Sequence, residues 1–343
     1  MRILVVHNHY GDYVIGGEAL VMQAEVALLR SHGHDVRVYE RTNAEIARRG
    51  LRGQIQAFRD VPWSEEGYQA VAREIDKFKP EVMHVHNYRF LLSPSIFKAA
   101  KERGVATCLT LHNYRLACPA GQFLRDGRVC EDCIQGMPYR MFWRRCSSKD
   151  TIKTLAQFYL YWDSRRRHYL APCVDAYIAL TEFGRTRFVA AGLPAGRVHV
   201  KPHFMEDPTG DQSPPQERRG ALFVGRLSPE KGVDLLLEAW RGIDYPLFIV
   251  GDGPLRAKLE KCASANVIFL GPLEHTACLT AMKKSAFLVF PSVWYEGFGL
   301  SLMESMACGI PSVAFDLGPR REMVIDGHNG FLCPAEDVGA FRE

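Results

Sequence analysis

Residues 221–232 read Ala-Leu-Phe-Val-Gly-Arg-Leu-Ser-Pro-Glu-Lys-Gly, and this stretch carries the pattern that decides the fold. The apolar run 221–224 has the length of a buried strand, and a glycine follows where the chain must turn. An apolar segment with helical spacing begins near Val233. A buried strand, a glycine turn and a helix form the repeating unit of parallel α/β proteins.

The same alternation extends in both directions along the chain and predicts parallel strands joined by helices. The predicted strands of the first half are 3–6, 36–39, 82–85, 106–111 and 174–179. Those of the second half are 221–224, 246–250, 267–270, 286–290 and 311–315. Residues 206–220 are rich in proline, glycine and charge, which predicts a linker with a boundary near residue 210. We therefore predict an α/β protein of two Rossmann-like, doubly wound domains, 1–208 and 209–343.

Length and composition agree with two soluble domains. The 343 residues suit two hydrophobic cores, and 47% hydrophobic with 24% charged residues excludes disorder, collagen and coiled coil. The longest apolar runs are far too short to span a membrane. The chain starts directly with a strand rather than a secretory signal, so we expect a cytoplasmic protein. A net charge of +4 is too small to predict nucleic acid as a partner.

Two such domains predict a ligand site in a shared cleft, because open parallel sheets bind ligands at the carboxyl ends of their strands. A two-lobed ligand-capture protein has the same architecture. Secreted proteins of that kind require a signal peptide, which this sequence does not show, so the motifs must distinguish the two interpretations.

Two motifs of the second domain are suited to a nucleotide sugar. Arg226 and Lys231 flank the turn after the first strand, and two cations suit a diphosphate. Residues 296–304, Glu-Gly-Phe-Gly-Leu-Ser-Leu-Met-Glu, follow a later strand, and their glycines leave backbone N–H groups open at a helix start. Glu304 follows Glu296 by eight residues, about two helical turns, so both carboxylates can bind hydroxyl groups of one ligand. The alternatives are a solvated basic loop and two surface glutamates.

Five motifs in order then identify a family resemblance. They are 225–232, Val-Gly-Asp-Gly-Pro at 250–254, Phe-Pro-Ser at 290–292, 296–304, and Asp-Gly-His-Asn-Gly at 326–330. Together they resemble the retaining glycosyltransferases of the GT-B fold, in the large family with paired glutamates eight residues apart, which is family 4-like and group 1. The resemblance covers most of residues 220–335.

The resemblance implies a role for each of these residues. It implies that Arg226 and Lys231 bind the donor diphosphate, that Glu296 is catalytic and binds the donor sugar, and that Glu304 binds the ribose. The remaining donor-binding residues that it implies are Gly297, Phe298, Gly299 and Leu300. It further implies retention at the anomeric carbon, and no metal cofactor, because the cations and the helix start stabilise the leaving diphosphate.

The first domain supplies candidates for the other side of the reaction. The resemblance matches the donor-binding candidates Gly16 and Gly17 to a loop that faces the donor. It places the catalytic candidate His112 beside the anomeric carbon. By itself, a histidine at a strand end is more often structural than catalytic. His84 and His86, at the preceding strand end, are candidates for the acceptor side. Asn113 departs from the family, which more often has Asp there.

A cysteine-rich insertion near 115–150 contains a Cys-x-x-Cys pair with one further cysteine on each side: Cys118, Cys130, Cys133 and Cys146. Four thiolates can complete a closed tetrahedral zinc site that clamps a loop. A disulfide or redox pair and ordinary thiols are the alternatives.

Aromatic and basic residues alternate between Tyr139 and Leu170, including Trp143, Trp162 and the run 165–167. Such segments can rest on an anionic membrane surface, and burial of the aromatic rings in the first domain is the alternative. We expect a cytoplasmic enzyme attached peripherally to the inner face of a membrane.

The expected activity is transfer of a hexosyl unit from a nucleotide-diphosphate sugar to a hydroxyl group of a saccharide or lipid-linked acceptor, in polysaccharide or glycolipid synthesis. A nucleotide-sugar epimerase, a phosphorylase and a non-catalytic nucleotide-sugar-binding protein are the alternatives. The chain stops at Glu343, earlier than family members usually do, so the second domain is expected to be truncated. The family's more common Gly-Gly is replaced by Gly318-Pro319, followed by Arg320 and Arg321.

Overall fold

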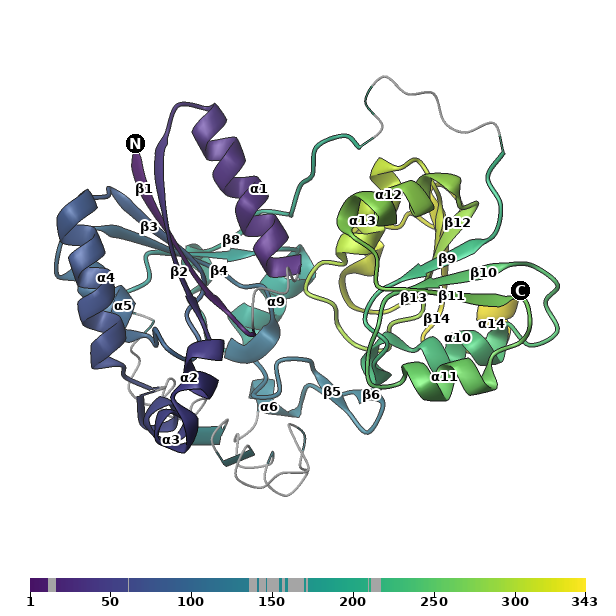
Figure 1. Cartoon of the computed structure of the whole chain (residues 1–343), viewed down its shortest axis with the longest axis horizontal. Helices are drawn as coiled ribbons and strands as arrows, with labels where there is room; N and C mark the ends of the chain where they lie inside the picture. The colour runs from purple at the N-terminus through teal and green to yellow at the C-terminus, as the bar shows by residue number, and fades with distance from the viewer. Residues whose placement is uncertain are drawn as a thin grey trace. The chain divides into compact units, whose positions relative to one another are not determined.

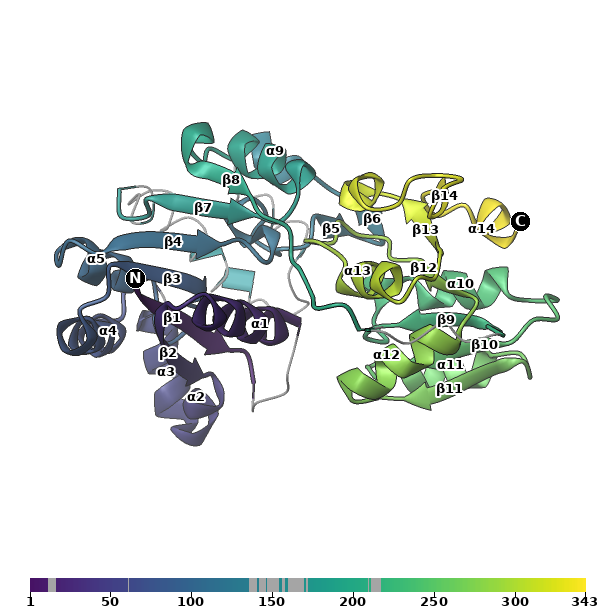
Figure 2. The same ribbon diagram turned by 90° about the horizontal axis from the view of Figure 1, so that it is seen from above.

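The computed structural model contains two compact units, each built around its own parallel sheet (Figures 1 and 2). It describes every residue except 12–16, 61, 136–140, 142–145, 147–153, 156–157, 160–169, 171, 209 and 211–216. The first unit comprises Met1–Gly121 and Glu131–Pro202, and the second comprises Gln122–Cys130 and His203–Glu343.

The first unit has a six-stranded sheet with the order β2-β1-β3-β4-β7-β8, in which all pairs are parallel. Its strands are β1 (Arg2–His9), β2 (Asp35–Thr42), β3 (Val82–Asn87), β4 (Ala106–Thr110), β7 (Ala176–Ala179) and β8 (Val198–Val200). Its helices include α1 (Gly17–Ser31), α2 (Ala44–Arg48), α3 (Gly50–Asp60), α4 (Glu65–Phe78), α5 (Ser95–Lys101), α6 (Asp132–Gln135) and α9 (Glu182–Ala190). The order along the sheet reverses between β1 and β3.

The second unit has a parallel sheet with the order β11-β10-β9-β12-β13-β14. The strands are β9 (Ala221–Val224), β10 (Leu247–Val250), β11 (Val267–Gly271), β12 (Phe287–Phe290), β13 (Ser312–Asp316) and β14 (Gly330–Pro334). The helices are α10 (Val233–Ala239), α11 (Arg256–Cys262), α12 (His275–Lys284), α13 (Leu300–Ala307) and α14 (Val338–Arg342).

Helices cover both faces of the second sheet because right-handed crossovers change face where the strand order reverses. In Figure 1, α12 and α13 lie on one side of the sheet, and α10 and α11 lie on the other. Each side has its own buried cluster, with Leu236 of α10 in one and Leu302 of α13 in the other. The architecture of two doubly wound α/β domains that the sequence predicted is confirmed.

All ten predicted strands are present, with ends that shift by a few residues. The division of the chain differs from the expected one in two respects: the second unit begins at His203, and it also includes residues 122–130 of the cysteine-rich insertion. Those residues form the antiparallel hairpin of β5 (Leu124–Arg125) and β6 (Arg128–Val129). Phe123 is 1% exposed and packs edge-on against the ring of Tyr295, with 5.8 Å between centroids. An apolar contact distant in sequence therefore assigns the hairpin to the second unit.

No helix in the described part of the chain is long and apolar enough to cross a membrane.

The turn after β9 brings Gly232 against the loop that follows β12. Gly232 has a φ of +64°, and a Cβ atom placed on it would lie 2.1 Å from the carbonyl oxygen of Pro291. Any side chain would force this carbonyl away. Gly327 in the same unit has a similar φ of +72°, but open space surrounds its Cβ position.

We predict that Gly232→Ala destabilises the second unit by about 1–3 kcal/mol more than Gly327→Ala does, because only the former adds a clash to the strain of a positive φ. Urea unfolding of the two variants measures the difference. Equal losses of stability in the two variants would show that the carbonyl group of Pro291 moves away without a cost in free energy.

Candidate functional site

The second unit gathers polar side chains where its strand order reverses. β9 and β12 are neighbours in the sheet, so the loops at their carboxyl ends lie together. Lys231 comes from the loop after β9, and Glu296 from the loop after β12. The Lys231 Nζ donates to Glu296 Oε1 at 2.7 Å. The structure thus brings together two predicted site residues that are 65 positions apart in the sequence.

Glu296 is a buried carboxylate with several donors. Besides Lys231, the hydroxyl group of Ser292 donates to Oε1 at 3.0 Å and the indole Nε1 of Trp294 donates to it at 2.8 Å. Burial opposes ionisation of Glu296, but Lys231, Arg320 and the indole outweigh burial and hold its pKa below the ordinary value. The carboxylate therefore stays charged and fixed at neutral pH.

Arg320 is a member of this network that sequence reasoning did not assign. Its side chain is fully buried and donates to the carbonyl oxygens of Phe315, Ser292 and Trp294 at 2.8, 2.6 and 3.0 Å. Burial lowers the pKa of Arg320 to about 10, against the opposing effect of Glu296. Arg320 therefore ties the loops after β12 and β13 together. The only signal in the sequence was the pair of arginines that follows Gly318-Pro319, where the family more often has Gly-Gly.

Arg226 has a different partner from Lys231. Its side chain is 64% exposed and pairs with Glu230 at 2.5 Å, and its Nε donates to Ser228 at 3.2 Å. Burial opposes ionisation of Glu230, yet the hydroxyl group of Ser228 and the guanidinium of Arg226 keep its pKa below the ordinary value. The two predicted diphosphate ligands thus stand on either side of the turn, each paired with its own carboxylate.

The glycine-rich segment 297–300 ends in a helix start, as the sequence predicted. Gly299 has a φ of +102° and precedes the first residue of α13, Leu300. The expectation that Glu296 and Glu304 are separated by two helical turns is wrong, because residues 296–299 are not helical. Phe298 packs instead against the ring of His203, with 5.0 Å between centroids.

Glu304 lies on α13 and contacts a residue that the sequence did not single out. The Nε2 of His275, the first residue of α12, is 2.9 Å from Glu304 Oε1. Burial raises the pKa of Glu304 above its ordinary value, and the contact with His275 only partly offsets that effect. The surroundings therefore raise the pKa of Glu304 and lower the pKa of Glu296.

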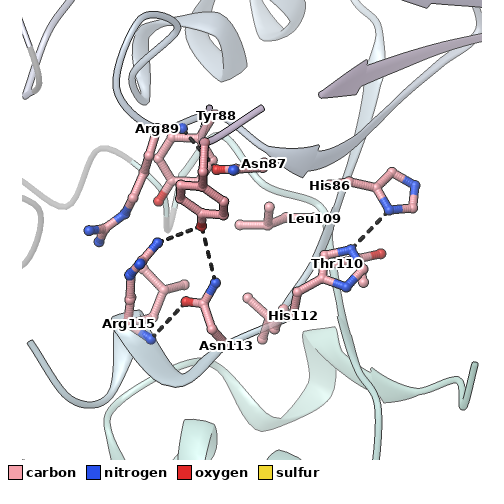
Figure 3. A pocket seen from close by; sticks show the side chains of 12 residues that line it. His86, Asn87, Tyr88, Arg89, Leu109, Thr110, His112, Asn113 and Arg115 are labelled. Carbon is pink, nitrogen blue, oxygen red and sulfur yellow. Dashed lines mark hydrogen bonds between the residues drawn. The ribbon is translucent and has the colours of Figure 1, made fainter. Parts of the chain in front are cut away.

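The first unit has its own pocket, here called the His112 pocket, at the carboxyl ends of β3 and β4 (Figure 3). Its empty space is about 360 Å³, including the open mouth. The residues that line it are Tyr10, His86, Asn87, Tyr88, Arg89, Leu109, Thr110, Leu111, His112, Asn113, Arg115 and Leu116. Two predicted site residues line this pocket, the acceptor-side candidate His86 and the catalytic candidate His112. The Nδ1 of His86 is 3.0 Å from the Nε2 of His112.

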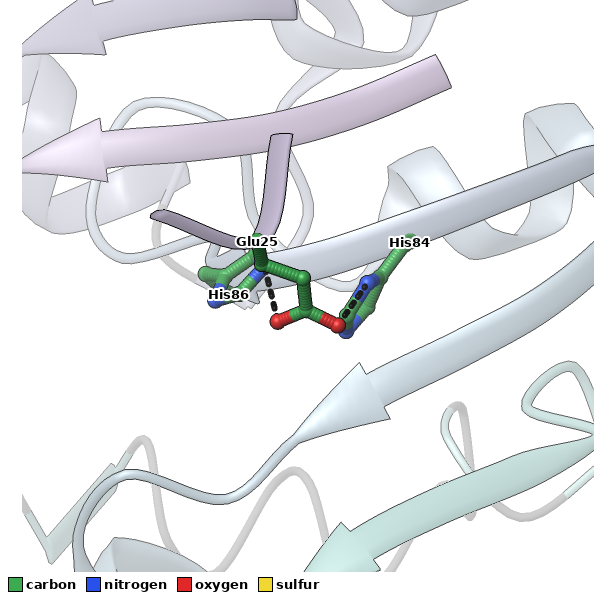
Figure 4. A group of neighbouring side chains, drawn as sticks. All are labelled: Glu25, His84 and His86. Carbon is green, nitrogen blue, oxygen red and sulfur yellow. Dashed lines mark ion pairs between the residues drawn. The ribbon is translucent and has the colours of Figure 1, made fainter. Parts of the chain in front are cut away.

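Behind His86 lies a buried cluster of Glu25, His84 and His86 (Figure 4). One carboxylate oxygen of Glu25 is 3.6 Å from the Nδ1 of His84, and the other is 3.6 Å from the Nε2 of His86. The Nε2 of His84 is 2.7 Å from the hydroxyl oxygen of Thr110. Burial lowers the pKa of both imidazoles below the ordinary value, so both are neutral at pH 7.

This cluster is the one group of three or more potential metal ligands found among the described residues. A cation already faces it, because the Nζ of Lys201 is 3.2 Å from Glu25 Oε1. We therefore interpret this cluster as one that holds imidazole rings in place rather than as a metal site. Glu25 orients His86, and His86 orients His112. No motif or spacing in the sequence pointed to Glu25 or Lys201.

The four cysteines of the insertion, Cys118, Cys130, Cys133 and Cys146, are all described, yet their sulfur atoms do not form such a group. The structural zinc stays a prediction. Gly16 lies outside the described residues, and Gly17 is the first residue of α1. Trp143, Trp162 and residues 165–167 also lie outside the described part of the chain.

Comparison with known proteins agrees with this architecture. The model of "Glycosyltransferase Family 4" matches residues 15–206, and that of "Glycosyl transferases group 1" matches residues 209–343. A glycosyltransferase of Methanocaldococcus jannaschii, named as uncharacterised, is 39% identical over 126 residues, which are 36% of each chain. Matched segments of this kind span only about a third of the curated relatives.

Two solved structures share the fold at low identity. Sucrose-phosphate synthase from Thermosynechococcus elongatus has a TM-score of 0.69 at 18% identity, covering 100% of this chain and 88% of its own. HepE from Anabaena, solved in complex with UDP-glucose, has a TM-score of 0.61 at 18% identity, covering 100% and 87%. The chain belongs to the family 4, group 1 glycosyltransferases of the GT-B fold.

The buried histidines of the first unit predict a pH dependence of its stability. Burial, and secondarily His9, lowers the pKa of His7 to about 4. The free energy of unfolding is therefore at its full value above about pH 6.5. It decreases as the pH falls toward 4, because the unfolded chain binds a proton at this histidine before the folded chain does. We expect a loss of about 2 kcal/mol from this residue between pH 7 and pH 5.

Amide hydrogen exchange of β1 at several pH values measures this effect. His7→Asn should flatten the pH dependence, whereas a matched change at the exposed His199, His199→Asn, should leave it as in the wild type. The same dependence of stability on pH in the wild type and in both variants would show that His7 does not cause it.

The pairing of Lys231 with Glu296 predicts a strong coupling in a double-mutant cycle. Lys231→Met should destabilise the second unit by about 3–5 kcal/mol, because it leaves a buried carboxylate without its cation. Adding Glu296→Gln should recover at least about 1 kcal/mol of that loss. Unfolding in urea gives the three values, and additivity would argue against the pair. The exposed pair of Arg256 and Glu260 on α11 is the control, with an expected coupling of at most about 0.5 kcal/mol.

Proposed function

We propose that this protein transfers a hexosyl unit from a nucleotide-diphosphate sugar to an acceptor hydroxyl group, with retention at the anomeric carbon. The observation that carries the proposal is the buried, ionised Glu296 held by Lys231 in front of the helix start at Gly299. The match of the group 1 family model to residues 209–343 supports it, as does the complex of the structurally similar HepE with UDP-glucose.

In the proposed reaction the donor diphosphate binds to Arg226, Lys231 and the backbone N–H groups at the start of α13. As the glycosidic bond lengthens, negative charge develops on the leaving diphosphate, and these groups are already oriented to stabilise it. No metal ion is needed for that role. An incoming diphosphate also provides a new partner for Lys231, and Glu296 is then available to hydroxyl groups of the sugar.

His112, positioned by His86, is proposed to act beside the anomeric carbon. The leaving phosphate accepts the proton of the attacking hydroxyl group, so the protein supplies position and charge rather than a nucleophile. The acceptor is proposed to be a saccharide or a lipid-linked saccharide bound by the first unit, in polysaccharide or glycolipid synthesis.

Measuring donor hydrolysis and sugar transfer separates this proposal from the alternatives. A panel of nucleotide sugars is first tested for an increase in the melting temperature, and each binder is then assayed with and without saccharide acceptors. Transfer with nucleotide release supports the proposal. A binding protein would retain the donor unchanged, an epimerase would change the sugar without releasing nucleotide, and a phosphorylase would require phosphate.

Substitutions of Lys231 and of Glu304 should have different kinetic effects. Lys231→Ala should weaken donor binding and slow turnover together, with a loss of about 2–4 kcal/mol in transition-state stabilisation, because the cation serves both donor and leaving group. Glu304→Gln should mainly raise the donor KM, because a ribose contact is the same in both states. Steady-state kinetics distinguishes them, and Glu274→Gln on the exposed surface should change neither constant. A defect of Glu304→Gln in kcat alone would contradict a ribose contact.

We also propose peripheral attachment of this protein to an anionic membrane surface through the segment that contains Trp143, Trp162 and residues 165–167. Each basic residue near such a surface contributes about 1 kcal/mol. The protein should sediment with vesicles of phosphatidylserine and phosphatidylcholine, but not with phosphatidylcholine alone, and high salt should release it. Replacing residues 165–167 with glutamine should abolish sedimentation. Equal behaviour toward both vesicle types would refute the attachment.

A further inference from the structure

The His112 pocket contains two arginines that no step of the proposed transfer uses. Arg89 follows β3, and Arg115 follows β4, so the two neighbouring strands of the sheet supply one each. Figure 3 shows both side chains on the side of the pocket away from His86. Their charges are close enough that Arg115 contributes to lowering the pKa of Arg89, after burial as the main cause.

The hydrogen-bond partner of the Arg115 guanidinium is a phenol group rather than a carboxylate. Arg115 donates to the hydroxyl group of Tyr10 at 2.5 Å, and its guanidinium lies 5.0 Å from the centre of that ring. For Arg89, the neighbouring side chain that favours its charged form is Tyr88, although burial lowers the pKa of Arg89 overall. In the described part of the chain, neither guanidinium forms an ion pair with Asp or Glu. Two guanidinium groups in a pocket without such a counterion attract an anion.

Glu18, an acidic side chain that interacts with Arg115 and Asn113, does not cancel the positive charge of the two arginines. Glu18 accepts a hydrogen bond from the amide of Asn113 at 3.4 Å. Burial raises the pKa of Glu18 above its ordinary value, against the smaller opposing effects of Asn113 and Arg115. Even a fully ionised Glu18 leaves one net positive charge among Arg89, Arg115 and Glu18.

The other titratable groups of the pocket add no negative charge at neutral pH. His86 is neutral, because burial holds its pKa well below the ordinary value. Burial also raises the pKa of Tyr10 and of Tyr88, so both phenols stay protonated. These phenols and the amide of Asn113 are further hydrogen-bond donors for an oxygen-rich group.

We infer that the His112 pocket binds an oxyanion, a phosphate or a carboxylate, carried by the acceptor. The arginines recognise this group through their paired N–H donors, and this contact holds the attacking hydroxyl group near His112. The inference rests on the proposed transfer, and it narrows the acceptor from any saccharide to an acidic one. Arginines that serve only to pack Tyr10 and Tyr88 are the competing interpretation.

Binding of four soluble probes to the full chain tests the inference. Glucose 6-phosphate carries a phosphate, glucuronate a carboxylate, dodecyl phosphate below its micelle concentration a lipid-borne phosphate, and methyl glucoside no charge. Titration calorimetry should show at least one anionic probe binding at least tenfold more tightly than methyl glucoside. The probe that binds most tightly identifies the source of the oxyanion.

Arg115→Met should weaken that probe at least tenfold, and Arg115→Lys should recover part of the loss, because lysine keeps the charge but not the paired donors. Arg89→Met should act like Arg115→Met. The control is Arg73→Met, at an exposed arginine of α4, which should change the affinity less than twofold. If Arg89→Met does not fold, the two Arg115 variants and the wild-type titrations still decide the matter.

Hydrolysis of the donor without acceptor keeps this inference separate from the proposed function. It should be measurable in the wild type and unchanged in the control variant Arg73→Met. If hydrolysis is intact but no anionic probe is preferred, or if Arg115→Met and Arg73→Met bind the probe equally, the oxyanion site is wrong. If the wild type neither binds nor hydrolyses any nucleotide sugar, the proposed function has failed, and the titrations with anionic probes still report on the pocket.

Discussion

The second unit depends on one constraint, the burial of a carboxylate that must remain charged. Glu296 is 7% exposed, and burial of that degree would neutralise an unpaired acid. Lys231, Arg320 and the donors Ser292 and Trp294 reverse this outcome by surrounding it with cations and hydrogen bonds. Because these groups come from the loops after three different strands, satisfying one charge fixes the positions of all three loops.

The first unit solves a similar problem with neutral groups. Glu25 lies between two imidazoles that burial keeps uncharged, and Lys201 provides the balancing cation. His86 links this cluster to His112 at the edge of the pocket. The result is a rigid histidine beside a pocket whose remaining charge is positive. A fixed position of this histidine fits the proposed transfer, in which the leaving group accepts the proton.

Both units place their polar groups at the same point of the fold for the same geometric reason. The strand order reverses between β1 and β3 in one sheet and between β9 and β12 in the other. Helices that leave in opposite directions keep the loops there open and close together. This explains why residues that carry chemistry follow the ends of predicted strands in both halves of the sequence.

The sequence by itself determined the class of fold, all ten strands that it predicted, and the motifs after β9 and β12. These features depend on local patterns, namely apolar runs, glycine turns and helical spacing, which can be recognised within a dozen residues. Even the separation of Glu296 from Glu304 was known, although not that a non-helical loop occupies half of it.

Tertiary structure alone decided which side chains share a partner. The hairpin at 122–130 belongs to the second unit because Phe123 packs against Tyr295, and Arg320 belongs to the site because it reaches backbone carbonyls 26 and 28 residues away. Glu25 approaches His84 and His86 only through the packing of α1 on the sheet. Contacts between residues that are distant in sequence leave no periodic signal in the sequence. They are determined by packing and by the pairing of buried charges, which exist only in the folded chain.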